Sequence, residues 1–137
     1  MNASAGYSGT PLAKKLGIRP GMTVAIIHPP AVYAQLLPGL ASDVTLTDAS
    51  TAGVDFIHIF VHEREALTEQ LRFLRTRIVS NGMIWVSWPK KASRVQTDLT
   101  EDVVRAAGLE AGLVDVKVCA VDETWSALKF VIRKADR

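Results

Sequence analysis

The segment Gly82-Met-Ile-Trp-Val-Ser-Trp-Pro-Lys-Lys-Ala-Ser93 runs from an apolar stretch directly into a basic loop. The apolar stretch is typical of a strand that is buried on both faces, as parallel sheets require. The sequence Asp98-Leu-Thr-Glu101, which follows shortly, has the spacing of a capping box at the start of a helix. A buried strand, a polar loop and a capped helix together predict an α/β fold. Such folds bind ligands at the carboxyl ends of their strands.

Two similar apolar runs lie earlier in the chain, at residues 23–27 and 55–61, and both predict central strands. Residues 43–47 alternate between polar and apolar side chains, which indicates a strand nearer the edge of the sheet. Towards the end of the chain, residues 114–121 and 126–133 predict two further strands. Because their connection is so short, this last pair is expected to be antiparallel.

Helices are predicted between the strands. A stripe of leucines predicts a helix over residues 63–79, ended by Asn81-Gly82. Shorter helices are predicted at residues 10–16, with Thr10 as the N-cap, and at residues 31–37. This order predicts a three-layer, doubly wound and mostly parallel sheet with an antiparallel C-terminal strand pair.

The composition is that of an ordinary globular chain of 137 residues with a formal net charge of +2. We expect a flexible tail over residues 1–9 and a single domain over residues 10–134. The small charge argues against binding to nucleic acid or to a membrane. No signal peptide or membrane span is recognisable, which predicts a cytoplasmic location. The apolar edge at residues 114–131 could pair across a two-fold axis in a homodimer.

The carboxyl ends of the three central strands are expected to meet at one edge of the sheet. His28 and His62 follow two of these strands, and Lys90, Lys91 and Arg94 follow the third. The histidines could form an acid/base pair, or they could simply be solvated residues at strand ends. No metal site is predicted, because a convincing third ligand is missing. The three cations could bind a small anionic or nucleotide-like ligand.

Aromatic and acidic residues extend this predicted site. Trp88 and Trp125 could supply flat surfaces for stacking a base, or they could be packing residues. Asp48 follows the edge strand at the spacing where nucleotide-binding folds place an acid on a ribose hydroxyl. The loop after the first strand is His28-Pro29-Pro30, which lacks the glycines of a cofactor loop and loses two N–H donors.

The predicted order of elements resembles the Rossmann-like fold of class I S-adenosylmethionine-dependent methyltransferases. That resemblance implies S-adenosylmethionine as cofactor, although the His-Pro-Pro loop departs from the pattern. Four segments also resemble an uncharacterised family of small bacterial proteins, classed as a domain of unknown function. These segments are Tyr7-Ser-Gly-Thr-Pro-Leu-Ala-Lys-Lys-Leu-Gly-Ile18, Trp85-Val-Ser-Trp-Pro-Lys-Lys-Ala-Ser93, Thr97-Asp-Leu-Thr-Glu101 and Val114-Asp-Val-Lys-Val-Cys-Ala-Val-Asp-Glu-Thr-Trp-Ser126.

The sequence leaves three functions open, and whether the chain is an enzyme stays open with them. The first is a binding or scaffold module with a degenerate cofactor loop, taking an anionic or nucleotide-like ligand. The alternative is an S-adenosylmethionine-dependent methyltransferase. The second alternative is a nucleic-acid-binding accessory protein, which would work through Lys14, Lys15, Lys90, Lys91 and Arg94 and is disfavoured by the small net charge.

Overall fold

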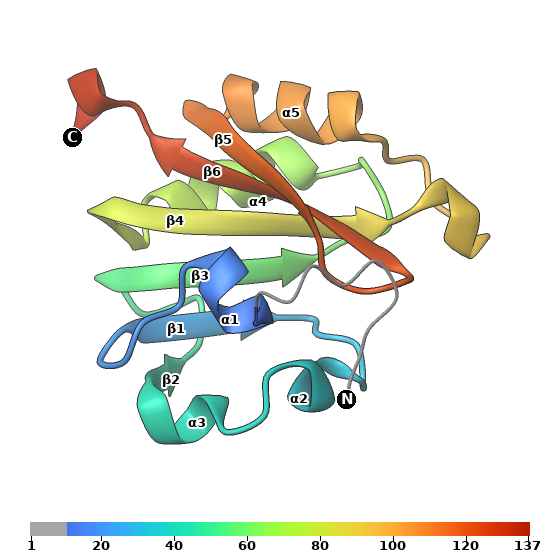
Figure 1. The fold of residues 1–137 in the computed structure, drawn as a ribbon. Helices are drawn as coiled ribbons and strands as arrows, with labels where there is room; N and C mark the ends of the chain where they lie inside the picture. Colours follow the sequence, from blue (N-terminus) through green and yellow to red (C-terminus); the bar gives the residue numbers. More distant parts are fainter. Residues whose placement is uncertain (1–10) are drawn as a thin grey trace.

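A computed structural model describes residues 11–137 and shows one six-stranded sheet in the order β2-β1-β3-β4-β6-β5 (Figure 1). Strands β1 to β4 are parallel, and β6 runs antiparallel between β4 and β5, which confirms the predicted fold class. The strands are β1 (Thr23–Ile27), β2 (Thr45–Thr47), β3 (Val54–Phe60), β4 (Ile78–Pro89), β5 (Leu113–Ala120) and β6 (Trp125–Ile132).

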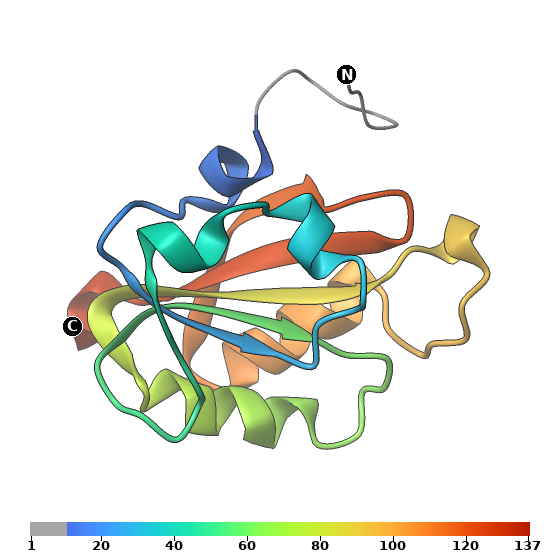
Figure 2. The same ribbon diagram turned by 90° about the horizontal axis from the view of Figure 1, so that it is seen from below.

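Helices cover both faces of the sheet and complete three layers (Figure 2). One face carries α4 (Leu67–Arg75) and α5 (Glu101–Glu110). The other carries three short helices, α1 (Leu12–Leu16), α2 (Tyr33–Leu36) and α3 (Leu40–Asp43). Two 3₁₀ turns, η1 (Lys91–Ser93) and η2 (Lys134–Asp136), follow β4 and β6. No helix within residues 11–137 is long and apolar enough to cross a membrane.

The sheet separates two apolar cores because successive residues of a strand point to opposite faces. Beneath α4 and α5, Leu71 and Val104 pack on Ile84 and Phe130. Helix α5 approaches the sheet closely at Gly108, where an added Cβ would lie 2.0 Å from Cε1 of Phe130. Glycine is therefore required here for packing, and α5 continues through it to end before Gly112.

On the opposite face, the core contains larger aromatic side chains and a hydrogen bond from the sheet to α1. Trp85 is fully buried in β4, and its indole Nε1 donates to the carbonyl oxygen of Leu16 at 2.7 Å. Phe56 and Phe60 of β3 lie in the same cluster. This contact fixes α1 against the centre of the sheet.

The predicted helix over residues 63–79 is wrong at both ends. Helix α4 begins at Leu67, and Ile78 belongs to β4, where it pairs with Val54. An apolar residue at helical spacing serves a buried strand equally well, so the stripe could not mark this boundary. Asn81-Gly82 does not end a helix but lies within β4, next to an irregularity in its pairing with β3.

Two other helix predictions need correction. Asp98 does not cap α5; the N-cap is Thr100, whose Oγ1 accepts from the Val103 amide at 3.2 Å. The helix predicted at residues 31–37 shortens to α2, and a separate α3 follows Gly39, which has a φ of 78°. Helices of four residues are too short to produce a periodic pattern. The predicted cap Thr10 lies outside the described residues.

Candidate functional site

A polar crevice lies at the carboxyl ends of β1 and β3. From β1 the chain passes to β2 on one side of it and then to β3 on the other, so the direction of winding reverses between β1 and β3. This is where open α/β sheets bind their ligands. The crevice has a volume of about 270 Å³ and is lined by His28, Phe60, Val61, His62, Glu63, Glu65, Ala66 and Gln70.

His28 enters the crevice from an unusual backbone conformation. Its φ is 55°, in the left-handed region that glycine adopts at no steric cost. Pro29 and Pro30 follow at once, and they end β1 because proline cannot extend a strand ladder. The loop therefore makes a glycine-like turn while placing an imidazole in the crevice.

His62 lies on the facing loop, which two hydrogen bonds fasten to the segment before α5. The hydroxyl of Thr97 donates to the His62 carbonyl at 2.5 Å, and the amide of Arg64 donates to Oδ1 of Asp98 at 2.8 Å. The His62 ring meets the ring of Trp125 edge to face, with centroids 5.2 Å apart. The structure thus brings the two predicted histidines together and holds the loop that carries one of them.

The charges along the crevice are negative. Glu63 and Glu65 are exposed, and no lysine or arginine is among the lining residues. Together with Gln70 and the two histidines, these carboxylates favour a ligand that carries positive charge and can exchange hydrogen bonds.

Asp48 lies at the same edge of the sheet, one strand away. Because Thr47 of β2 pairs with Ala25 of β1, Asp48 follows at the carboxyl end beside β1. Its Oδ1 accepts from the Ser50 amide at 2.9 Å and from the Ser50 hydroxyl, and these hydrogen bonds lower the pKa of the carboxyl. Asp48 is therefore an ionised and exposed acceptor at neutral pH.

The predicted basic loop does not join the crevice. Lys90, Lys91 and Arg94 lie beyond the end of β4, in and around η1, and none of them lines the crevice. Lys91 and Arg94 are exposed, whereas Lys90 is half-buried and its amide donates to the Thr124 carbonyl at 2.7 Å. Their role in binding an anion stays a prediction.

Both predicted tryptophans are largely buried. Trp88 is 5% exposed and packs in the core under α4 and α5. Trp125 is 7% exposed and packs in the opposite core, with its ring edge-on to Phe60. Packing explains both rings, and the Trp125 ring lies edge to face with two residues that line the crevice, Phe60 and His62.

A buried chain of three polar side chains lies behind the crevice. In the sequence, His58 within an apolar strand indicated a hydrogen-bonded core histidine but not its partners. The Tyr33 hydroxyl and Nδ1 of His58 are 3.0 Å apart, and Nε2 of His58 lies 2.7 Å from Oγ of Ser87. Burial lowers the pKa of His58 to about 3 and raises that of Tyr33. The imidazole is therefore neutral, so it donates through one ring nitrogen and accepts through the other. This chain ties α2, and with it the loop after β1, to β3 and β4.

Metal binding finds no support in the described residues. Within residues 11–137, no group of three or more histidine, cysteine, aspartate or glutamate side chains could hold a metal ion.

Comparisons with solved structures identify the fold. A methyltransferase from Aquifex aeolicus that depends on S-adenosylmethionine superposes with a TM-score of 0.62 and 16% identity, over 89% of this chain and 88% of that chain. The magnesium protoporphyrin IX methyltransferase of Synechocystis PCC 6803 with bound S-adenosylmethionine gives 0.57 and 14% identity, over 89% and 74%. Its complex with S-adenosylhomocysteine gives 0.57 and 13%, over 89% and 80%.

These similarities define the class of fold. The chain has the class I, S-adenosylmethionine-dependent methyltransferase-like fold, with its mostly parallel sheet and antiparallel C-terminal pair. No family model matches the sequence, and no curated protein matches it either. At identities of 16% and below, the likeness concerns the fold alone.

Proposed function

We propose that this chain is an S-adenosylmethionine-dependent methyltransferase whose cofactor binds in the crevice between β1 and β3. The observation that carries the proposal is the position of a polar, acid-lined crevice at the point where the winding of this fold reverses. The structural neighbours that bind S-adenosylmethionine and S-adenosylhomocysteine support the same choice of cofactor.

The residues present fit most of the cofactor. Asp48 is an ionised acceptor for ribose hydroxyls. Glu63 and Glu65 give the crevice negative charge, which suits the two cations of S-adenosylmethionine, its sulfonium and its ammonium group. The poor fit is at the cofactor carboxylate, because Pro29 and Pro30 provide no N–H donors. Gln70 and the two histidines carry side-chain nitrogens along the crevice that could face this carboxylate.

In this proposal His28 and His62, which both line the crevice, move the proton. When bound, S-adenosylmethionine supplies an electrophilic methyl group. An acceptor that attacks through an O–H or N–H group must lose its proton, and histidine is the side chain that accepts one near neutral pH. The loop contacts through Thr97 and Asp98 would hold His62 in position for this role.

A titration of the full chain tests cofactor binding. We expect S-adenosylmethionine to raise the melting temperature and to bind more tightly than S-adenosylhomocysteine, because only the former is a sulfonium cation. At 100 times its Kd the ligand should add about 2.7 kcal/mol to the free energy of unfolding. Asp48→Asn should weaken binding, whereas Glu123→Gln, an exposed acid in the β5–β6 connection, is the matched control. An absence of binding by either compound at millimolar concentration would contradict the proposal.

A second candidate is favoured by the His28-Pro29-Pro30 loop itself. A chain that has lost the donor amides of a cofactor loop could act as a binding or scaffold module for an anionic or nucleotide-like ligand near Lys90 and Lys91. The same titration separates the two functions. Stabilisation by nucleotides but not by the sulfonium compound, abolished by Lys90→Ala with Lys91→Ala, would favour the module.

A further inference from the structure

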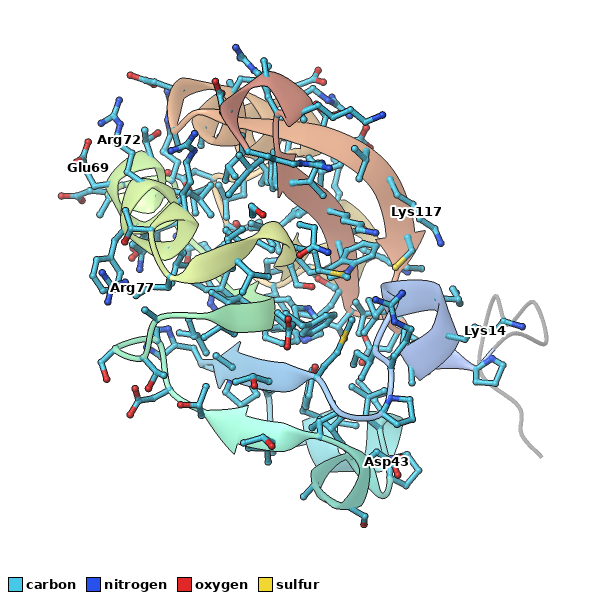
Figure 3. All side chains as sticks on the ribbon, turned by 90° about the vertical axis from the view of Figure 1, so that its left-hand side faces the viewer. Lys14, Asp43, Glu69, Arg72, Arg77 and Lys117 are labelled. Atoms are coloured by element: carbon cyan, nitrogen blue, oxygen red, sulfur yellow. The ribbon has the colours of Figure 1, made fainter. Side chains whose placement is uncertain are left out.

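Five basic residues form a strip across α1 and the β5–β6 hairpin, on the face opposite α4 and α5. The strip consists of Lys14, Lys15, Arg19, Lys117 and Lys129. Nζ of Lys117 donates to the carbonyl oxygen of Lys15 at 3.2 Å, so the hairpin and α1 form one surface. Figure 3 shows Lys14 and Lys117 on the same side of the molecule, with Arg72 and Arg77 on the opposite side.

The strip contains a repulsive pair that the fold does not need. Lys117 of β5 and Lys129 of β6 are directly opposite one another in the strand register. Like charges in this arrangement destabilise a sheet. Lys129 is also half-buried, and its pKa is lowered first by burial and then by the nearby charges of Lys117 and Arg19. Retaining both charges at one place on the sheet opposes folding.

Acidic residues of the described part of the chain form no ion pair with the strip, although Asp43 lines the same pocket as Arg19. Residues 1–10 contain no aspartate or glutamate. Burial raises the pKa of the Cys119 thiol, and the nearby charges of Lys15 and Lys117 act in the opposite direction. The local potential is therefore positive although the whole chain has a net charge of only +2.

We infer that the basic strip binds the phosphate backbone of a nucleic-acid strand. Lysine is depleted at protein–protein interfaces, whereas lysine and arginine supply most contacts to phosphates. Charges spread over a helix and a hairpin suit an extended polyanion with regularly spaced charges. Lys90, Lys91 and Arg94 do not belong to this surface, because the basic loop lies beyond the carboxyl end of β4, away from Lys14 and Lys15 of α1 (Figure 1). It does not depend on methyltransferase activity.

Fluorescence anisotropy with a fluorescein-labelled single-stranded RNA of about 20 nucleotides tests the inference on the full chain. Wild-type protein should bind at 50 mM salt. Lys117→Gln with Lys129→Gln should weaken binding by about tenfold or more, and should reduce the slope of log K against log salt by about 1.4, or about 0.7 per cation. Arg72→Gln with Arg77→Gln removes the same charge from the opposite face and should leave binding within about twofold of wild type.

The melting temperature controls for folding: relief of the Lys117–Lys129 repulsion should offset the lost hydrogen bond from Lys117 to the Lys15 carbonyl, so the melting temperature should stay close to that of the wild type. Three results would overturn the inference: no binding by the wild type at 50 mM salt, equal losses in the two double variants, or an unchanged salt slope. Tighter binding to polyglutamate or to phosphatidylserine vesicles than to RNA would assign the strip to an acidic protein or a membrane instead, and would also overturn it.

Discussion

The two faces of the sheet are packed by different means. Under α4 and α5 the core is mainly aliphatic, with Trp88 and Phe130 among its members, and the helices have nine and ten residues whose apolar stripes face it. On the other face α1, α2 and α3 have four or five residues, and specific hydrogen bonds fasten α1 and α2 to the sheet. A hollow of about 570 Å³, lined mainly by apolar residues of α2, α3 and the neighbouring strands, remains on this second face. Buried apolar area holds α4 and α5 on the sheet, whereas α1 and α2 also depend on individual hydrogen bonds.

The largest test of this difference compares two buried leucines. Leu71→Ala in α4 should lower the free energy of unfolding by about 2–5 kcal/mol, because the surrounding core cannot close the cavity. Leu37→Ala, beside the hollow on the other face, should cost about 2 kcal/mol, since its neighbours already border open space. Urea denaturation measures both. Equal losses would show that the two faces are equally well packed.

The buried polar chain is tested by Tyr33→Phe. This change leaves a ring nitrogen of His58 without its partner and should cost about 1–3 kcal/mol in denaturant unfolding. Tyr33→Phe combined with His58→Leu and Ser87→Ala should recover part of the loss, because apolar replacement of all partners removes the unsatisfied group. Additive losses in the triple variant would argue that the chain contributes nothing as a unit.

The pH dependence of stability tests the same chain. The folded pKa of His58 is about 3, below its ordinary value of 6.5, so the folded state binds fewer protons than the unfolded state between these values. Its contribution is therefore complete above pH 6.5 and is lost as the pH falls towards 3, by up to about 1.4 kcal/mol per unit. Denaturation at pH 7.5 and pH 5 should show this loss in the wild type and a smaller one in His58→Leu. Identical losses would exclude His58 as the cause.

The smallest effect concerns the start of α5. Thr100→Ala removes the N-cap and should cost about 1 kcal/mol of stability. Asp98→Ala should leave α5 intact and instead release the Arg64 amide in the crevice loop. Hydrogen exchange distinguishes the outcomes, because the two variants should lose protection in the first turn of α5 and in residues 63–66, respectively. Loss of α5 protection in Asp98→Ala would restore the capping box that the sequence suggested.

The part of the fold that follows from local patterns was predictable. Strand β1 was predicted with its observed bounds, and the antiparallel pairing of β5 and β6 followed from their short connection. The misassignment of Ile78 has a physical cause, since a strand pairing with Val54 and a helical stripe both require an apolar residue there. Asp98 satisfied a capping pattern, but a distant amide at Arg64 is its actual partner.

Within the candidate site, too, some residues could be placed from the sequence and others could not. His28 and His62 could be placed together because parallel strands end at one edge of a sheet, and both line the crevice. The tryptophans could not be placed, because whether an aromatic ring faces solvent depends on which helix covers it. The register of β5 against β6 sets Lys117 opposite Lys129, and a bulge near Asp115 shifts that register by an amount that no local pattern encodes.

The hydrogen bond between Trp85 and Leu16 has a consequence for the order of folding. The two residues are 69 positions apart, so α1 emerges from the ribosome long before the strand that anchors it. During synthesis α1 cannot form its contact with Trp85 until β4 has been made. Its docking then closes a long loop, which is slow because such contacts carry a large entropy cost. Helix α1 is therefore expected to dock on the sheet only after β4 has formed.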